Sequence, residues 1–510
     1  MPVFTKESIP TEDIQCDVCI IGSGAGGATV AAGLAKLGLD VVMLEAGEYH
    51  TQKDFDMDEA KAFQLRYQEQ GLRSTDDVSI AILQGRGVGG STTINWTSCF
   101  RTPPKILDLW RDKFGIQSLS TETLAAHFDA VEERLSIQTW QESLINPNNQ
   151  VLVRGAQKLG WDYATLRRNV KGCHNSGYCG MGCPTNAKQG MLVTHIADAL
   201  ENGMRLYANT EAEKIVVHNN KVEKIIVRID ASKNGKTESI QRNIYPKICV
   251  SSCGAINGPA LFLRSNINHN NLVGSRTFLH PVVGLASMFT EAINGWYGAP
   301  QSVSSHHFIE RGADNVGFFF EAAPTHPILA ATAATGFGHT QQEFMKRLSH
   351  ASFLIALHRD GVVDGDNGGT VSVTPSGRIK LHYPISTMLQ ESFRTSMQKG
   401  AELCLAAGAT EVQSLHSPAV VMKTTADIQK LDQVSYGTLQ HRIFTAHQMG
   451  GLAMGADPNS SVVNDHLQHH QISNLFVVDG SVFPTSLGVN PSETIYAIAH
   501  WAVQHIHAAL

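Results

Sequence analysis

The chain has 510 residues, of which 42% are hydrophobic and 17% charged, and its formal net charge is -6 at pH 7. This composition indicates a globular protein with two or three structural units, and an acidic balance without a basic block excludes nucleic acid as an expected partner. The sequence has no run of eighteen apolar residues, so no transmembrane segment is predicted. Nine cysteines in so long a chain do not make a disulfide framework.

The first stretch, MPVFTKESIPTEDIQ, lacks the basic and apolar regions of a secretory signal. We therefore expect a cytoplasmic protein, although a partner could carry an export signal. Next comes a predicted βαβ unit, with strands at 16–21 and 40–44 and a helix rich in small residues at 26–37. Cys16 and Cys19 form a C-x-x-C whose side chains point to opposite faces of the first strand. We interpret them as packing residues and not as a redox pair.

The turn after the first strand has a glycine pattern typical of dinucleotide sites. Gly22, Gly24 and Gly27 spell G-x-G-x-x-G between strand and helix. The first permits a tight turn, the second lets the backbone approach a pyrophosphate, and the third lets helix and strand pack closely. Glu45 ends the next strand, placed to accept hydrogen bonds from an adenosine ribose. These residues predict a dinucleotide site without choosing between FAD and NAD.

A second glycine-rich segment, GRGVGGSTTINWTSCFRTP, spans residues 85–103. Its glycine density argues against a regular helix or strand and allows close approach to a large flat ligand. Two such segments favour an extended cofactor over a briefly docking nicotinamide. Further along, helices are expected at 120–135, capped by Ser120, and at 148–159.

Three cysteines follow in CHNSGYCGMGCP, which we call the cysteine run. Cys173, Cys179 and Cys183 could hold a metal centre, form a disulfide or line a tight loop. A disulfide is unexpected in a reducing cytoplasm. Zinc would need a fourth ligand, and the one local candidate, His174, adjoins a ligand instead of lying at the usual spacing.

The second half of the chain is predicted to add two hairpins, turning at 219–220 and 375–377. Residues 246–266 should form a strand, a turn and a helix. A long helix is expected over 387–407, and a strand at 474–480 precedes a helix from about 491. We predict an α/β fold in which a Rossmann-like domain, built from discontinuous segments, carries a mostly β domain with helices.

The C-terminal segment offers candidate catalytic groups. His447 lies in TAHQMGGLAMG, and Asn490 lies in VVDGSVFPTSLGVNPSETIYAIAHWAV. Asn490 is predicted to cap the last helix, with Pro491 in the first turn and Glu493 completing a capping box. The positive end of that helix would suit an anionic reduced flavin. Taken alone, His447 could equally be a satisfied polar histidine and Asn490 a plain cap.

Four segments together resemble the glucose–methanol–choline (GMC) oxidoreductases in order and spacing: the N-terminal fingerprint, GRGVGGSTTINW, HQMGGLAMG and VVDGSVFPTSLGVNPSETIYAIA. The resemblance spans almost the whole chain and implies FAD, bound covalently or noncovalently. On this basis we predict FAD-binding segments at 1–110 and 191–285, a helical and cysteine-rich insertion at 111–190, a substrate-binding domain at 286–435, and a FAD-binding and catalytic segment at 436–510.

The resemblance also implies site residues. The positions that bind the ADP part of FAD are matched by Gly22, Gly24, Gly27 and Glu45, and the adenine contact by Ala212. The segment beside the pyrophosphate and the flavin ring is matched by Gly89, Gly90, Ser91 and Asn95. The ribityl and pyrophosphate contacts are matched by Asp479 and Gly480. His447 and Asn490 match the paired catalytic residues. Asparagine at the second position resembles cholesterol oxidases and FAD-dependent sugar dehydrogenases.

These residue types suit alcohol oxidation, in which a hydroxyl proton leaves as hydride passes from the same carbon to flavin N5. Neutral His447 could accept the proton and Asn490 could donate a hydrogen bond to the substrate oxygen. We expect a dehydrogenase using an acceptor other than oxygen. The alternatives are an oxygen-using oxidase, a lyase on the same fold, and a flavin-binding protein without activity. NWTSCFRTP resembles long-chain alcohol oxidases and related bacterial dehydrogenases, and FFFEAAPTHP, which contains Glu321, is expected to line a pocket for an aliphatic or cyclic alcohol.

The spacing of Cys173, Cys179, Cys183 and Pro184 is similar to the run that holds a 3Fe–4S cluster in bacterial FAD-dependent glucose dehydrogenases. Thiolates suit such a cluster. However, an extra cysteine beside the first ligand is missing, and related alcohol oxidases carry similar loops as plain structure. The cluster and a structural loop therefore stay open. A cluster would pass electrons singly to a cytochrome or quinone partner, which would favour a dehydrogenase.

Overall fold

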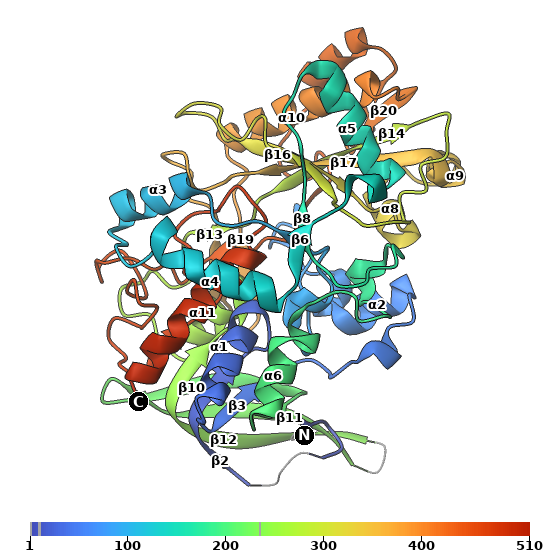
Figure 1. Ribbon diagram of the computed structural model, residues 1–510. Helices are drawn as coiled ribbons and strands as arrows, with labels where there is room; N and C mark the ends of the chain where they lie inside the picture. Colours follow the sequence, from blue (N-terminus) through green and yellow to red (C-terminus); the bar gives the residue numbers. More distant parts are fainter. Residues whose placement is uncertain (1–2, 9–11, 234–235) are drawn as a thin grey trace.

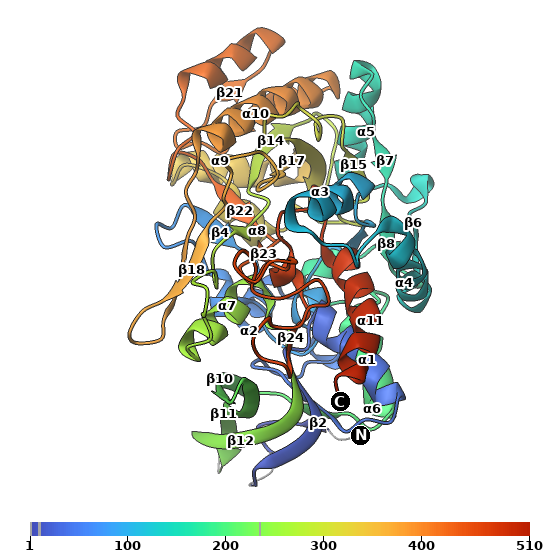
Figure 2. The ribbon, with the colours of Figure 1, turned by 90° about the vertical axis from the view of Figure 1, so that its left-hand side faces the viewer.

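The computed structural model describes residues 3–8, 12–233 and 236–510. It contains two large sheets, one towards each end of the molecule, with helices packed around them (Figure 1). The first sheet has eight strands and lies at the lower end of Figure 1, and the second has nine and lies at the upper end. The two sheets remain separate in the view turned by 90° (Figure 2). The predicted α/β architecture is confirmed.

The first sheet has the strand order of a dinucleotide-binding fold. Five parallel strands lie in the order β9 (Arg205–Tyr207), β3 (Val41–Leu44), β2 (Ile14–Ile21), β12 (Lys236–Ser251) and β24 (Leu475–Val477). Among these five strands, the chain begins with the central β2, adds β3 and β9 on one side and then crosses to β12 and β24 on the other, as in doubly wound folds. Because these strands come from distant stretches, the Rossmann-like domain is discontinuous, as predicted. β1 (Val3–Phe4) extends the sheet beyond β9.

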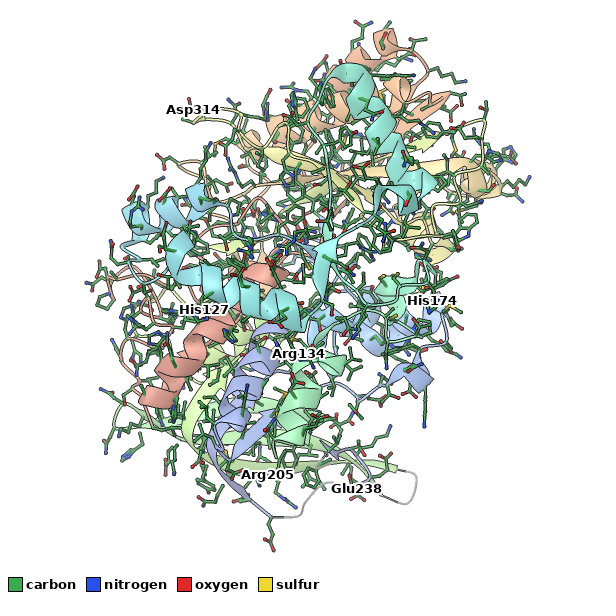
Figure 3. The ribbon with its side chains drawn as sticks, in the orientation of Figure 1. His127, Arg134, His174, Arg205, Glu238 and Asp314 are labelled. Carbon is green, nitrogen blue, oxygen red and sulfur yellow. The ribbon has the colours of Figure 1, made fainter. Side chains whose placement is uncertain are left out.

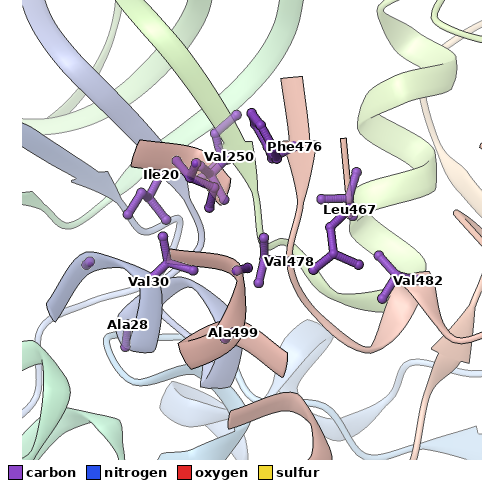
Figure 4. Packing of buried hydrophobic residues seen from close by; sticks show 14 of the residues in the cluster. Ile20, Ala28, Val30, Val250, Leu467, Phe476, Val478, Val482 and Ala499 are labelled. Carbon is purple, nitrogen blue, oxygen red and sulfur yellow. The ribbon is translucent and has the colours of Figure 1, made fainter. Parts of the chain in front are cut away.

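Three helices pack together over one face of this sheet: α1 (Ala25–Lys36), α6 (His195–Glu201) and α11 (Ser492–Ala508) (Figure 1). Small residues in α1 permit a close approach, since a Cβ on Gly33 would lie 2.6 Å from a methyl group of Val503. Ile20, Val30 and Val250 are fully buried in the core between strands and helices (Figure 4). Burial of each such side chain stabilises the fold by about 1.5–3 kcal/mol.

β12 pairs with different strands along its length. Its N-terminal half is antiparallel to β11 (Lys221–Lys233), and its C-terminal half is parallel to β2. β11 and β10 (Thr210–His218) form the predicted hairpin, turning at Asn219 and Asn220, whose φ angles are 49° and 57°. Asparagine tolerates this left-handed backbone, which a two-residue hairpin turn requires.

The second sheet draws on widely separated strands: β21 (Val421–Met422), β20 (Glu411–Ser414), β14 (Val282–Met288), β17 (Ala351–His358), β16 (Phe318–Ala323), β15 (Val303–Ser305) and β7 (Ala164–Thr165), with β22 (Ile443–Thr445) pairing with β14 and β4 (Ile80–Ile82). Two helices that match predicted ones, α5 (Pro147–Leu159) and α10 (Thr387–Ala406), pack against it. The domain boundaries given above remain a prediction.

The remaining elements surround these two parts. The helices are α2 (Glu59–Arg66), α3 (Pro104–Phe114), α4 (Thr121–Arg134), α7 (Gly254–Arg264), α8 (Pro327–Ala333) and α9 (His339–Lys346), and the strands are β5 (Ser98–Cys99), β6 (Ile137–Thr139), β8 (Arg167–Asn169), β13 (Thr277–Phe278), β23 (Met449–Gly450) and the predicted hairpin of β18 (Thr370–Val373) and β19 (Ile379–His382). As predicted, Ser120 caps α4, accepting a hydrogen bond from the Thr123 amide (3.1 Å). In the part of the chain that the structure describes, no helix has the length and apolar character needed to cross a membrane.

Gly26 in α1 has no room for a side chain, because a Cβ there would lie 1.8 Å from the carbonyl oxygen of Val478. Gly26→Ala should keep α1 from docking, since the backbone it meets does not move aside as a flexible side chain would. We expect a lower melting temperature and less folded protein, measured by circular dichroism. Gly24→Ala is the matched control when both variants are compared without bound ligand, because nothing in the protein lies within 4 Å of a Cβ at that position. Equal melting temperatures for the two variants would contradict this packing.

Candidate active site

A cavity of about 460 Å³ lies at the carboxyl ends of β2 and β12 and continues to the second sheet. This is the point where the strand order reverses, at which open α/β sheets bind ligands. The predicted site residues that line it are Gly22, Gly24, Glu45, Gly90, Ser91, Asn95, Ala212, His447, Asp479, Gly480 and Asn490. Two others, Gly27 and Gly89, lie behind this lining.

The first glycine turn has the geometry that its sequence predicts. Gly22 has φ of +104°, and a Cβ there would lie 2.3 Å from the carbonyl oxygen of Ser252. A Cβ on Gly27 would lie 2.1 Å from the carbonyl oxygen of Gly22, so this glycine permits the contact of helix and turn. Gly24 faces open space and is the N-cap of α1, where no side chain caps the amides. Those amides are therefore available to a phosphate.

Glu45 joins this turn to the second glycine-rich segment. One carboxylate oxygen accepts hydrogen bonds from the hydroxyl (2.6 Å) and amide (3.3 Å) of Ser23. The other accepts from the amides of Gly47 (2.9 Å) and Gly87 (3.2 Å). Glu45, the predicted ligand contact, therefore also holds the two segments together. Ser23, which occupies an unspecified position of the glycine fingerprint, takes part in this hydrogen bonding.

The second glycine-rich segment lies directly against the first. A Cβ on Gly90 would lie 2.8 Å from the Cα of Gly24. The hydroxyl of Ser91 accepts a hydrogen bond from the Gly85 amide (2.9 Å), which holds the segment in a tight loop. Asn95 lines the cavity, and its Oδ1 is buried without a hydrogen-bond partner. A buried amide oxygen in this state is an acceptor that a bound ligand could satisfy.

Asp479 connects the end of β24 to the start of α7. Its carboxylate accepts hydrogen bonds from the amides of Gly254 (2.8 Å) and Ser481 (2.7 Å). Burial raises the pKa of this carboxyl above its ordinary value. Ala212, in β10, lines the cavity at the far end of the same sheet.

His447 follows β22 and lies beside a histidine that the sequence analysis missed. Its Nδ1 lies 3.2 Å from Nδ1 of His280, and Nε2 of His280 accepts a hydrogen bond from the Gly488 amide (3.0 Å). Neutral His280 therefore carries its hydrogen on Nδ1 and donates it to His447, which leaves the hydrogen of neutral His447 on Nε2. Burial lowers the pKa of His447 to about 4 and that of His280 well below its ordinary value. Both rings are neutral near pH 7.

Asn490 lies differently from the prediction. α11 begins at Ser492 with Pro491 as its N-cap and no capping side chain, so the predicted capping box is wrong. Both carboxylate oxygens of Glu493 lack a hydrogen-bond partner, and one lies 3.6 Å from the Arg167 guanidinium. Asn490 instead lines the cavity, with its Oδ1 buried and unpartnered.

Apolar side chains of the second sheet line the cavity near these groups: Val282 on β14, Ile355 and Leu357 on β17, and Phe444 on β22. The expectation that FFFEAAPTHP lines the pocket is wrong, because β16 is fully buried and residues 318–327 do not reach the cavity. Glu321 is fully buried and is not part of the lining, but its Oε2 accepts a hydrogen bond from Nε2 of Gln301 (2.6 Å), which does line the cavity. A lone carboxyl group in an apolar strand was the sequence signal for this residue.

The three cysteines of the cysteine run line a separate small cavity. All three are free thiols, so the disulfide alternative is not formed. Among the residues that the structure describes, no three His, Cys, Asp or Glu side chains are arranged to hold a metal ion. His174, the candidate fourth zinc ligand, is exposed at the edge of the molecule (Figure 3).

Two buried cations lie beside this cavity. The guanidinium of Arg168 is fully buried and donates to the sulfur of Cys179 at 3.8 Å. The ammonium of Lys188 donates to the carbonyl oxygens of Thr93 (2.5 Å), Asn95 (3.0 Å) and Cys179 (2.7 Å). Burial raises the pKa of the Cys183 thiol, but hydrogen bonds to Thr185 and the charge of Lys188 outweigh it, and the pKa falls below its ordinary value.

Comparison with known proteins decides the family. Two models described as GMC oxidoreductase match residues 62–282 and 367–499. The chain belongs to the GMC oxidoreductase family. Two long-chain-alcohol oxidases of Arabidopsis thaliana are 29% and 30% identical over 97% and 96% of this chain. The chain spans about two thirds of their length, 68% and 66%.

Solved structures share the fold. A pyridoxine 4-oxidase from Mesorbium loti has a TM-score of 0.70 at 16% identity, over 97% of this chain and 99% of its own. A formate oxidase of Aspergillus oryzae, studied for modification of its FAD, has a TM-score of 0.71 at 13% identity, over 98% and 99%. These likenesses confirm the predicted GMC fold.

The residues present fit FAD, the cofactor of this family. Gly22 and Gly24 leave space and free amides at the start of α1, where a pyrophosphate would bind. The buried Oδ1 of Asn95, which has no hydrogen-bond partner, would accept a hydrogen bond from the cofactor. Ala212 and Glu45 would meet the adenosine end, and Asp479 the centre of the molecule. His447 and Asn490 line the same cavity.

Glu45→Ala should reduce FAD retention at least about tenfold, because a single charged hydrogen bond contributes about 1.5–3 kcal/mol and four donors would lose their acceptor. Flavin absorbance per protein after gel filtration measures this. Glu48→Ala, at a partly exposed neighbour that pairs with Lys6 and His50, is the control and should retain FAD. Release of NAD without a flavin spectrum would overturn the cofactor assignment.

Proposed function

We propose that this protein oxidises a CH–OH group to an aldehyde or ketone, with FAD as cofactor. The observation that carries the proposal is that His447 and Asn490 line one cavity with both glycine-rich segments, beside an apolar lining. FAD bound there would supply the hydride acceptor. The protein must add a group that takes a proton and a donor at the substrate oxygen.

His447 is proposed to take the hydroxyl proton. To accept it on Nε2, His447 must carry its own hydrogen on Nδ1, which makes Nδ1 of His280 the acceptor. His280 then carries a hydrogen on Nε2 and no longer accepts from the Gly488 amide, so we propose that this contact opens when alcohol binds. Asn490 would donate from Nδ2 to the substrate oxygen as negative charge develops there.

An aliphatic or cyclic alcohol is the proposed substrate. The apolar lining formed by Val282, Ile355, Leu357 and Phe444 supports it, as do the names of the long-chain-alcohol oxidase relatives. Those names also support an oxygen-using oxidase, whereas the sequence favoured a dehydrogenase with a cytochrome or quinone acceptor. Mixing the reduced protein with air-saturated buffer in a stopped-flow instrument separates the two, since only an oxidase is reoxidised within one turnover.

The variant His447→Ala should still bind FAD, but alcohol should reduce that FAD about 10²–10⁴-fold more slowly than in the wild type, because a general base usually contributes a factor of this size. Anaerobic stopped-flow bleaching of the flavin measures this rate. Because the pKa of His447 is about 4, the wild-type rate should stay constant from pH 7 down to about pH 5. His469→Gln is the control, a buried histidine with the pKa also lowered to about 4 but outside the cavity lining. Wild-type reduction by His447→Ala would leave His447 a structural residue.

For the cysteine run we propose loop packing instead of a 3Fe–4S cluster, because its thiols are not arranged as a ligand set. Protein purified without oxygen should show a plain flavin spectrum and no iron or acid-labile sulfide, also after iron and sulfide reconstitution. Cys179→Ser should leave that spectrum unchanged. Brown protein with iron, sulfide and an EPR signal that Cys179→Ser removes would restore the cluster.

A further inference from the structure

His280, whose ring contacts His447, has a backbone conformation that its sequence disfavours. Its φ is +43°, in the left-handed region that is uncommon for residues other than glycine, and the next residue is Pro281. Proline favours extended backbone in the residue before it. A strained conformation of this kind persists only where the surrounding structure holds it. The segment between β13 and β14 therefore needs a support from elsewhere in the chain.

The carboxyl group of Asp360, which follows β17, supplies this support. Its Oδ2 accepts a hydrogen bond from the Leu279 amide (2.8 Å), and its Oδ1 accepts one from the amide of His280 itself (3.1 Å). Two successive amides directed at one group form a concave site for a carboxylate. The Tyr383 hydroxyl donates to the same carboxyl (2.6 Å), and the Ser486 hydroxyl donates to the Asp360 carbonyl oxygen (2.5 Å). Asp360 is 0% exposed, so water does not compete for these bonds.

The two amides keep their acceptor whether or not Asp360 is ionised. Burial and the charge of Asp366 raise the pKa of Asp360 to about 7. A protonated carboxyl group would donate its hydrogen to the Tyr383 oxygen, and each carboxyl oxygen would still have a lone pair for one amide. An asparagine side chain has the same shape but a single acceptor atom, so it cannot serve both amides. The support therefore depends on a carboxyl group and not on its charge.

The supported segment is tied to His447 in two places. The Leu279 carbonyl oxygen accepts a hydrogen bond from the Thr445 hydroxyl, and Oγ1 of Thr445 accepts one from the His447 amide (3.1 Å). Nδ1 of the His280 ring lies 3.2 Å from Nδ1 of His447. The other hydrogen bond of this ring, from the Gly488 amide to Nε2, opens in the reaction proposed above. From that point the ring depends on its backbone for its place against His447.

We propose that Asp360 is a positioning residue, which holds the backbone of His280 and thereby keeps the His280 ring in contact with His447. Asp360 is not part of the cavity lining, so it acts through His280 and not directly on cofactor or substrate. The effect on flavin reduction rests on the proposed function above, whereas the support of the His280 backbone does not.

The variant Asp360→Asn, loaded with FAD, tests this. Its side chain leaves one backbone amide without an acceptor, so the Leu279 and His280 amides should exchange with deuterium at least about tenfold faster than in the wild type. The limiting rate of flavin reduction by alcohol should fall about 10–10²-fold, because a small misplacement of a reacting group can cost this much. The alcohol concentration that gives half of this rate should change less than about twofold, since the lining is unaltered.

The variant Glu59→Gln is the matched control. The Glu59 carboxylate also accepts hydrogen bonds from two successive amides, those of Ile328 (2.7 Å) and Leu329 (2.8 Å). It joins α2 to α8 and is not part of the cavity lining. Glu59→Gln should therefore speed up deuterium exchange at Ile328 and Leu329 and leave the rate of flavin reduction unchanged.

A second variant applies if Asp360→Asn does not fold. Tyr383→Phe removes only the hydroxyl that donates to Asp360, and it should show both effects in the same direction at a smaller size. Mass spectrometry of deuterated peptides measures the exchange, and anaerobic stopped-flow bleaching measures the rate.

The exchange measurement does not need an alcohol substrate. Faster exchange at Leu279 and His280 in the variants supports the proposal even if no alcohol reduces the flavin, an outcome that would overturn only the proposed function. Unchanged exchange at these two amides in Asp360→Asn would show that the carboxyl group does not hold them. Wild-type flavin reduction by Asp360→Asn, despite faster exchange, would overturn the positioning role.

Discussion

The hydrogen bonds of the Glu45 carboxylate hold together the two glycine-rich segments that line the cavity. It takes hydrogen bonds from Ser23 on the first glycine turn and from Gly87 on the second glycine-rich segment, and the Ser23 hydroxyl in turn accepts from the Gly89 amide (3.0 Å). A buried charge is costly unless its hydrogen bonds are made. Two segments distant in sequence are therefore held in register before a ligand arrives, which reduces the entropy that binding must overcome.

At the end of the cavity near His447, the ionisable side chains are neutral. His447 and His280 are uncharged because burial removes water that would hydrate their cations, and Glu321 is uncharged for the corresponding reason. A substrate would thus meet oriented dipoles in place of fixed ions. Such dipoles act strongly on charge that develops during a reaction, since little water is present to screen them.

Features encoded within short stretches were predictable from the sequence. The βαβ unit, the turn at Gly22 and the hairpin at Asn219 depend on neighbouring residues, and the structure has all three. The capping box at Asn490 was wrong, although its local pattern was good, because the side chain is turned to the cavity and Pro491 takes the cap position. Local preference is weak where a tertiary contact competes with it.

Partners brought together from distant strands were not predictable. His280 meets His447 only because β14 and β22 pair at Val282 and Phe444. Likewise, Gln301 and Glu321 meet because β15 and β16 pair. The placement of FFFEAAPTHP failed for a related reason: its position behind the cavity follows from the order of strands in the sheet, which a single sequence does not show.

The ammonium of Lys188 mechanically couples two loops. It holds the carbonyl oxygens of Thr93 and Asn95, next to the cavity, and that of Cys179 in the cysteine run. Because one group donates to all three, a movement of Asn95 would be transmitted to the cysteine run. A fluorescent label on Cys183, whose thiol is partly accessible and has a pKa below its ordinary value, would therefore act as a remote sensor of cavity occupancy.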